Sequence, residues 1–374
     1  MKERKTAVIK IAIPFVTEES PNMKGLRIVG DRPARMNYLD ALSLEAESVA
    51  GDFEDCLIKA ISVEGPMPSI MSPDGLGGLL RRILALFDVD PACEISLAAV
   101  PHTVGVPSLT GWGQGRINRI SLKAGSLQAA ELSSLGASYG LSDIQNALLF
   151  FDKFHMRNVD VELLVGIPGQ SESSLMRSIR SLASIDAPHV TLKPFEADGA
   201  LDLSSERVLL DKACERLVSE GYSHYSPGRF ARKAAYESAL VRGIARGSYL
   251  IGVGLGALTV GDDFAYRNTT DYAQYVSAPD DPRVAVEKTV LIDEAHASSL
   301  EAGRVLMLPG GLATSSSNKR VEGKGRIFAE LSVMEQRGLV FHQGDSWGLT
   351  KEGLFSWVFG QGASSITEAV DLLR

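Results

Sequence analysis

Short apolar runs and amphipathic segments alternate along the first 260 residues of the chain. The apolar runs have the length of β-strands, and they lie at residues 7–13, 59–63, 94–100, 119–124, 159–166, 189–195 and 250–258. Between them, apolar residues recur at helical spacing after a serine of the helix-capping kind. The predicted helices begin at Ser72, Ser142, Ser171 and Ser204. Repeated strand–helix units imply an α/β protein with a parallel sheet covered by helices. About six such units, without a dinucleotide-binding glycine fingerprint at the first turn, favour a partial (β/α) barrel over a doubly wound sheet.

The pattern changes after residue 260, which predicts two domains at residues 1–260 and 261–374. A helix is predicted at 291–306, a polar linker at 309–318, a second helix at 325–337 and a small hairpin at 339–349, before a final pair of helices. Helix, hairpin and helix in this order outline a winged-helix-like module. Because the hairpin carries few basic residues, a capping role is favoured over DNA binding.

Composition and charge narrow the class of protein. Of the 374 residues, 45% are hydrophobic and 22% are charged, as in an ordinary globular protein. The net charge of −8 argues against a nucleic-acid or an anionic-membrane partner. No apolar stretch is long enough to span a membrane, and the N-terminus does not read as a signal peptide. Cys56, Cys93 and Cys214 are too widely spaced for a disulfide framework or a clustered metal site, so we expect reduced thiols and a cytoplasmic protein.

Three local features have structural explanations. The glycine-rich segment 252–257 lacks the spacing of a phosphate loop and predicts a tight turn at the end of a strand. Glu45, Glu47 and Glu54 are expected on a solvated helix surface. His224 is expected to be a partly buried structural residue rather than a contact to a tetrapyrrole.

Six segments, in a consistent order, carry a resemblance to a known family. They are IKIAIPF (9–15), PSIMSPDGLGGLL (68–80), GRINRISL (115–122), VDVELLVGIPGQS (159–171), GYSHY (221–225) and GVGLGALT (252–259). In these segments the chain resembles the oxygen-independent coproporphyrinogen III oxidases and HemW heme chaperones, which are radical S-adenosylmethionine (SAM) proteins. The resemblance implies a partial (β/α)6 TIM-type barrel of the radical SAM kind with a C-terminal HemN-type domain. It also implies bound SAM and a [4Fe-4S] cluster held by a CxxxCxxC motif.

The residues at the implied cluster positions depart from the family pattern. Val16, Ser20 and Met23 stand where the resemblance places the three cysteines, and none of them supplies a thiolate. We therefore expect the purified protein to be colourless and to bind no iron–sulfur cluster. Residues 17–26, which correspond to the cluster loop, should be ordered by protein contacts or not at all.

The positions implied in SAM binding also differ from the family. The family's GGGTP segment is residues 64–68 here, and Pro66 removes a backbone N–H from it. Lys10 stands in place of a tyrosine, and Glu162 in place of an aspartate. These substitutions predict that SAM has been lost together with the cluster. We expect no cofactor, and heme is a candidate ligand.

Strand alternation predicts what fills the former SAM pocket. Asp160 and Glu162 share one face of their strand, and the same parity turns Lys10 and Lys123 into the barrel beside Gly65. A lone buried charge is costly, so these groups should pair. We expect Lys10 or Lys123 to lie within about 4 Å of Glu162 or Asp160. Such a lysine would occupy cofactor volume and repel the positive sulfonium of SAM.

Three hypotheses of function follow. The favoured one is a non-catalytic homologue, a binding or scaffold protein linked to heme or tetrapyrrole metabolism that binds a ligand in the barrel or pairs with an active paralogue. A second is a functioning radical SAM oxidase-like enzyme whose cluster is supplied in an unusual way. A third is new chemistry at the barrel mouth, where such folds place their sites. Its candidate groups are Lys10, Lys123, Asp160 and Glu162.

Overall fold

The fold is built on one curved sheet of parallel strands with helices on its outer side. The computed structural model describes residues 4–17, 26–195, 203–277, 286–292, 294–308, 324–344 and 346–359. The parallel strands lie side by side in chain order: β1 (Lys5–Ala12), β4 (Cys56–Glu64), β5 (Val89–Ala99), β6 (Arg119–Gly125), β7 (Val159–Val165) and β8 (His189–Pro194). The predicted α/β partial barrel is therefore confirmed. Within the described residues the sheet does not close on itself.

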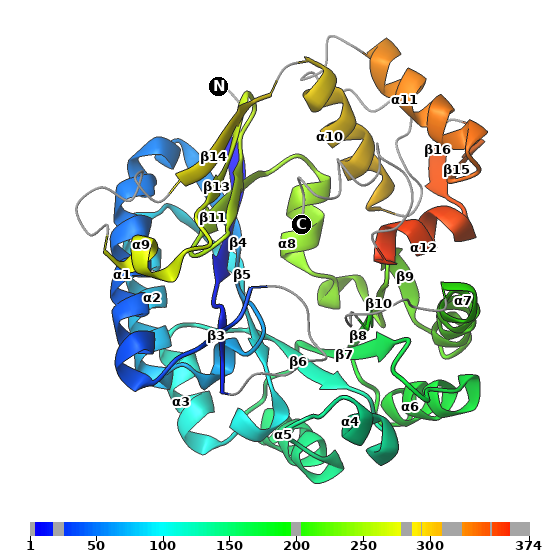
Figure 1. Cartoon of the computed structure of the whole chain (residues 1–374), viewed down its shortest axis with the longest axis horizontal. Helices are drawn as coiled ribbons and strands as arrows, with labels where there is room; N and C mark the ends of the chain where they lie inside the picture. Colours follow the sequence, from blue (N-terminus) through cyan, green and yellow to red (C-terminus); the bar gives the residue numbers. More distant parts are fainter. Residues whose placement is uncertain are drawn as a thin grey trace.

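An outer layer of helices follows the sheet. Figure 1 shows these helices in an arc around the strands. They are α1 (Arg32–Ala50), α2 (Pro73–Leu86), α3 (Val106–Gln114), α4 (Ala129–Ser134), α5 (Leu141–Lys153), α6 (Glu172–Ser184) and α7 (Leu203–Ser219). The side chains between this layer and the sheet form one large apolar core, which stabilises the curvature that shapes the inner face.

Local capping sets where the helices begin. The hydroxyl of Ser72 accepts a hydrogen bond from the third residue of α2, as predicted, and Ser171, where the next helix was predicted to begin, caps α6 in the same way. The predicted cap at Ser142 is wrong, because α5 begins one residue earlier, with Gly140 as its cap. The carboxylate of Asp143 accepts the N–H of Gly140 at 2.8 Å, which fixes this start.

A short helix lies inside the curve of the sheet. Helix α8 (Ala239–Ala245) packs Leu240 and Ile244 against Val8 of β1 and Ala60 of β4. Figure 1 shows α8 on the inner side of the strands, opposite the outer helices. It covers part of the inner face with apolar side chains, and its first residues border a cavity that polar side chains of β5, β6 and β7 also line.

Further strands extend both edges of the sheet. At one edge β11 (Tyr249–Val253) runs parallel to β1, and β12 (Leu258–Val260), β13 (Phe264–Asn268) and β14 (Val286–Leu291) follow as antiparallel neighbours. At the other edge β10 (Arg229–Ala231) and β9 (Ser223–Ser226) form an antiparallel hairpin beside β8. The predicted single strand at 250–258 is wrong, because the chain reverses at Gly254, whose φ is +110°. The tight turn predicted for 252–257 is confirmed.

The C-terminal part forms a second, smaller core. It contains α10 (Glu294–Leu306), α11 (Lys324–Gln336), the hairpin β15 (Val340–Gln343) and β16 (Ser346–Leu349), and α12 (Lys351–Phe359). This is the predicted order of helix, hairpin and helix. The predicted linker at 309–318 and the second of the final helices lie outside the described residues. Because the sheet continues from β11 through β14, the domain boundary near residue 260 stays a prediction.

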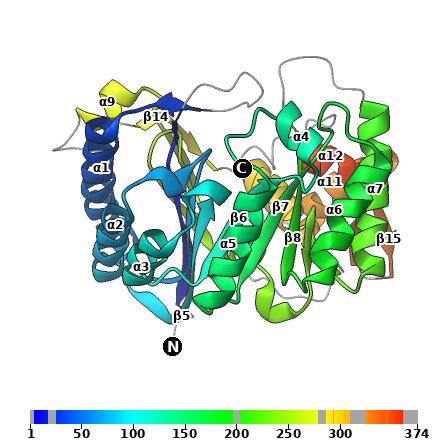
Figure 2. The ribbon, with the colours of Figure 1, turned by 90° about the horizontal axis from the view of Figure 1, so that it is seen from below.

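The C-terminal elements pack against the second half of the barrel. Arg207 of α7 forms an ion pair with Glu352 of α12 at 2.7 Å, and Lys351 pairs with Glu215 at 3.0 Å. Figure 2 shows α12 and α11 beside α7 on this side of the molecule. The remaining described elements are β2 (Phe15–Val16), β3 (Ile28–Val29) and α9 (Tyr272–Val276). No helix in the described ranges combines the length and the apolar character needed to cross a membrane.

Candidate functional site

The inner face of the sheet carries charged side chains, and its outer face carries aliphatic ones. On β7, Val161 and Leu163 are fully buried beneath the helices, whereas Asp160 and Glu162 line a cavity on the inner face. The register of β6 and β7 places Lys123 beside Glu162. Successive residues of a strand point to opposite faces, so the predicted parity is correct for these strands.

Two adjoining cavities lie at this inner face. The first has a volume of about 280 Å³ and is lined by Gly65, Lys123, Asp160 and Glu162, with α8 contributing its floor. The second, of about 220 Å³, is lined by Lys10 and shares Gly65 with the first. The structure thus brings four of the five predicted pocket residues around one cavity and places Lys10 at its neighbour.

The charged groups of the cavity are paired with one another. Lys123 Nζ lies 4.0 Å from Glu162 Oε1, at the limit that was predicted. The other oxygen of Glu162 is 2.6 Å from Nζ of Lys193, a residue of β8 that the sequence reasoning missed. Lys10 pairs with Glu64 at 2.9 Å, and not with Asp160 or Glu162. The sequence could have predicted Lys193, because it lies two residues after Thr191 in β8 and therefore points to the same inner face of the sheet.

These ion pairs hold the carboxylates of Glu64 and Glu162 in their charged form. Burial acts to raise the pKa of Glu64, but Lys10 outweighs it and lowers the pKa to about 2. Burial also opposes ionisation of Glu162, and Lys193 and Lys123 together hold its pKa below the usual range. Burial lowers the pKa of Lys123 in spite of Glu162. Glu64 and Glu162 are therefore charged at neutral pH.

Asp160 belongs to a different network, built around a buried histidine. Nδ1 of His189 lies 2.7 Å from Asp160, and Nε2 lies 2.9 Å from the hydroxyl of Tyr225. Ser121 and Thr191 also donate hydrogen bonds to the Asp160 carboxylate. Burial lowers the pKa of His189 to about 4, so the imidazole is neutral, donates from Nδ1 and accepts from Tyr225. His189 is fully buried, so it anchors Asp160 rather than meeting a ligand.

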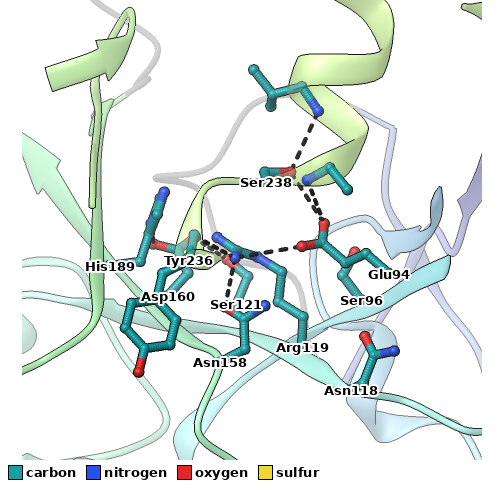
Figure 3. A network of polar contacts seen from close by, with 12 residues as sticks. Glu94, Ser96, Asn118, Arg119, Ser121, Asn158, Asp160, His189, Tyr236 and Ser238 are labelled. Atoms are coloured by element: carbon teal, nitrogen blue, oxygen red, sulfur yellow. Dashed lines mark hydrogen bonds and ion pairs between the residues drawn. The ribbon is translucent and has the colours of Figure 1, made fainter. Parts of the chain in front are cut away.

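A second buried ion pair ties the barrel to α8. Arg119 of β6 lies 3.6 Å from Glu94 and donates to Asn158 and to the carbonyl of Tyr236. Figure 3 shows Arg119 among these groups, with Glu94 reaching the first residues of α8. The N–H of Ala239 donates to Glu94 at 3.0 Å, so this carboxylate caps α8. The floor of the cavity is thereby fixed to β5 and β6.

Glu45 was expected on a solvated surface, and this expectation is wrong. It is buried on the inner side of α1, where its carboxylate accepts the N–H of Gly254 at 2.7 Å and Nδ2 of Asn268 at 2.5 Å. The hydroxyl of Tyr275 also donates to it. Burial raises the pKa of Glu45 to about 7 against these hydrogen bonds. Glu45 thus connects α1 to the glycine-rich turn and to the strands beyond it.

His224 lies away from the cavity. Its ring stacks on Phe230, at 4.3 Å between centroids, whereas the next residue, Tyr225, bonds to His189. Phe230 belongs to the outer apolar core, so His224 is on the outer face of β9. Burial lowers its pKa to about 4. This agrees with the partly buried structural role that was predicted.

Gly65 stands where the chain leaves β4, and its backbone cannot take a side chain. Its φ is +134°, and a Cβ there would lie 1.9 Å from the carbonyl oxygen of Ile13. We expect Gly65→Ala to lower the free energy of unfolding by about 3 kcal/mol or more, because backbone strain and the clash add. Gly51→Ala is the matched control, since Gly51 is helical and nothing lies within 4 Å of its Cβ position. Urea denaturation measures both, and equal stabilities would contradict this account.

The residues described at the implied cluster position do not fit an iron–sulfur cluster. Val16 lies in β2 with a buried aliphatic side chain, and Ser20 and Met23, with the loop 18–25, lie outside the described residues. The thiols of Cys56 and Cys93 lie in strands, and burial raises the pKa of both, to about 12 for Cys93. Cluster ligands are thiolates. No group of three or more His, Cys, Asp and Glu side chains in the described ranges is placed to hold a metal ion.

Comparison with known proteins finds relatives by sequence among the HemW heme chaperones and the radical S-adenosyl methionine domain-containing proteins. No protein-family model matches the chain. The heme chaperone HemW of Escherichia coli is 25% identical over 259 residues, which are 66% of this chain and 68% of HemW. The mitochondrial radical S-adenosyl methionine domain-containing protein 1 of Danio rerio is 24% identical over 232 residues, 58% of this chain and 52% of that protein. The matched part is thus about half the length of the zebrafish protein.

A solved structure shares the fold along almost the whole chain. The coproporphyrinogen III oxidase HemN of Escherichia coli, described as a radical SAM enzyme, superposes with a TM-score of 0.80 at 16% identity. The superposition covers 99% of this chain and 91% of HemN. The C-terminal elements are therefore part of the shared fold.

These relatives correct the expectation that the chain has no cofactor. That expectation rested on residues 16, 20 and 23 and on the substituted SAM positions. It is wrong, because the Danio rerio relative and HemN are named as radical SAM proteins and no observation shows that the cluster or SAM has been lost. Sequence and fold agree: the chain is similar in sequence to the HemW heme chaperones and shares its fold with the radical SAM enzyme HemN.

Proposed function

We propose that this chain is a heme-related binding protein, which holds a tetrapyrrole without oxidising coproporphyrinogen. The HemW relatives, which are named heme chaperones, support the link to heme. The observation that carries the proposal is the pairing of charges in the barrel. Glu162 is shared by Lys123 and Lys193, and Glu64 is held by Lys10.

Paired groups of this kind suit binding better than proton transfer. A general acid or base works best with a pKa near the working pH. The pKa of Glu64 is about 2, and that of Glu162 is below its usual range. His189 is neutral but fully buried behind Asp160 and Tyr225. Glu64, Glu162 and His189 are therefore not poised to exchange a proton at neutral pH, and the two carboxylates offer a ligand fixed charges.

An exposed histidine at the same end of the sheet is the candidate ligand for heme iron. His102 follows β5 and stacks on Tyr139, with ring centroids 6.2 Å apart. The Tyr139 hydroxyl donates to the carbonyl of Lys123 at 2.8 Å, which places this pair at the carboxyl end of β6. Histidine is a common axial ligand of heme iron.

A heme titration tests the proposal. We expect a saturable shift of the Soret band, weakened at least tenfold in His102→Ala. His155→Ala is the control, because His155 is also exposed but lies beyond the C-terminus of α5, away from the cavity. Anaerobic incubation with coproporphyrinogen III, SAM and a reductant should give no protoporphyrinogen. A wild-type protein without a Soret shift, or one that turns over this substrate, would refute the proposal.

The relatives favour a second candidate, a radical SAM enzyme with an unusual supply of its cluster. Anaerobic reconstitution with iron and sulfide tests it. Stoichiometric iron and sulfide with broad visible absorbance, together with SAM cleavage, would establish this candidate in place of the first. A partner role beside an active paralogue predicts co-purification with a chain that carries the three cysteines.

A further inference from the structure

Arg229 is held at the barrel cavity by a tight turn. The hairpin of β9 and β10 turns at Gly228, whose φ is +69° and whose Cβ would lie 2.6 Å from the carbonyl oxygen of Leu192. Arg229 follows at once and lies directly opposite Thr191 in the antiparallel ladder. Directly opposed residues share a face of the sheet, and Thr191 donates to Asp160 on the inner face at 2.9 Å. Arg229 accordingly lines the cavity.

The guanidinium of Arg229 has no partner among the described residues. No hydrogen bond or ion pair joins it to another side chain in those ranges, although carboxylates line the same cavity. Asp160 is already engaged by His189, Ser121 and Thr191. A half-buried guanidinium with its donors unused is costly unless something binds it.

The charges around the cavity do not balance. The cationic side chains are Lys10, Arg119, Lys123, Lys193 and Arg229, and the carboxylates are Glu64, Glu94, Asp160 and Glu162. Two pairs, Lys10 with Glu64 and Arg119 with Glu94, are neutral. The remaining three cations face two carboxylates, because His189 is uncharged. Among the described residues one positive charge is left over, and Arg229 is the cation of this cavity to which no side-chain hydrogen bond or ion pair is made.

We propose that the cavity binds the carboxylate group of a small organic anion through Arg229. The planar guanidinium matches a carboxylate with two parallel hydrogen bonds. Lys193, whose side chain is 43% exposed beside the same cavity, can turn toward the incoming anion. A volume of about 280 Å³ suits a small acid, or one carboxylate arm of a larger ligand. This site does not depend on heme binding.

Calorimetric titration of the full chain with sodium propionate and sodium succinate, at constant ionic strength, tests the site. We expect saturable binding by the wild type, and weakening by tenfold or more in Arg229→Gln. Arg229→Lys should be intermediate, because it keeps the charge and loses the two-pronged contact. Arg246→Gln is the control, since Arg246 is exposed after α8 and makes the same change in net charge.

The outcomes separate a specific site from a general charge effect. Circular dichroism and thermal melting establish that each variant is folded, and Arg229→Lys serves if Arg229→Gln does not fold. Absence of saturable binding to the folded wild type would overturn the proposal. Equal weakening in Arg229→Gln and Arg246→Gln would overturn it as well.

The same titrations assign the source of the carboxylate. If propionate competes with heme, the site holds a propionate arm of the tetrapyrrole. If propionate binds and heme binding is unchanged or absent, the site holds a free small acid. Both results support a carboxylate site. Propionate binding without heme binding would support this site even if the proposal of heme binding had failed.

Discussion

Replacing Glu45 with alanine is expected to lower the free energy of unfolding by about 3 kcal/mol or more, because several buried hydrogen bonds are lost at once. The substitution leaves three buried donors without an acceptor: the N–H of Gly254, the amide of Asn268 and the hydroxyl of Tyr275. Each buried donor without a partner costs about 1–3 kcal/mol. Against a total stability of about 5–15 kcal/mol, this is a large fraction.

Urea denaturation of Glu45→Ala and Glu47→Ala provides the measurement. Glu47 lies on the same helix, but it is partly exposed and forms a surface ion pair with Arg82. A surface pair contributes about 0–1 kcal/mol, so Glu47→Ala should be nearly neutral. Similar losses in the two variants would show that the buried carboxylate does not hold the glycine-rich turn.

The dependence of stability on pH should reveal Glu45 and His189 acting in opposite directions. The folded pKa of Glu45 is about 7, above the ordinary 4.5, so its contribution is complete below pH 4.5 and is lost as the pH rises through 7. The folded pKa of His189 is about 4, below the ordinary 6.5. Its contribution is present above pH 6.5 and is lost as the pH falls through 4.

Each contribution amounts to about 3 kcal/mol across its window, at 1.36 kcal/mol per pKa unit. Because the two windows overlap, they offset each other in the wild type between about pH 4.5 and 6.5. Relative to the wild type, Glu45→Gln should become steadily more stable as the pH rises through this range, and His189→Gln steadily less stable. Denaturation at several pH values measures both slopes. Curves parallel to the wild type would contradict the two pKa assignments.

Local pattern was sufficient to predict the parallel strands and the inward parity of Asp160 and Glu162. Both follow from the alternation of side chains along single strands, which needs no knowledge of distant contacts. The same rule applied to β8 would have turned Lys193 inward and given Glu162 its second lysine. The predicted ion pairs included Lys10 and Lys123 but not Lys193.

Other features depend on contacts that no local pattern contains. Glu45 has the spacing of a surface residue on a helix, and it is buried by a turn more than 200 positions away, as its bond to Gly254 shows. Of the two lysines offered as partners of Glu162 or Asp160, Lys123 meets the prediction, whereas Lys10 pairs with Glu64 at the end of the neighbouring strand β4. Arg229 was overlooked although the Pro227-Gly228 turn before it marks a hairpin.

The position of β1 has a consequence for how the protein is made. β1 is bonded to β4 on one side and to β11 on the other, and these partners end at Glu64 and Val253. At about 5–20 residues per second, a ribosome needs roughly 10–40 s to add the intervening part of the chain. During that time one row of backbone groups on β1 stays open, as on any exposed sheet edge. Nascent chains that stall before Val253 are therefore expected to associate with each other through β1.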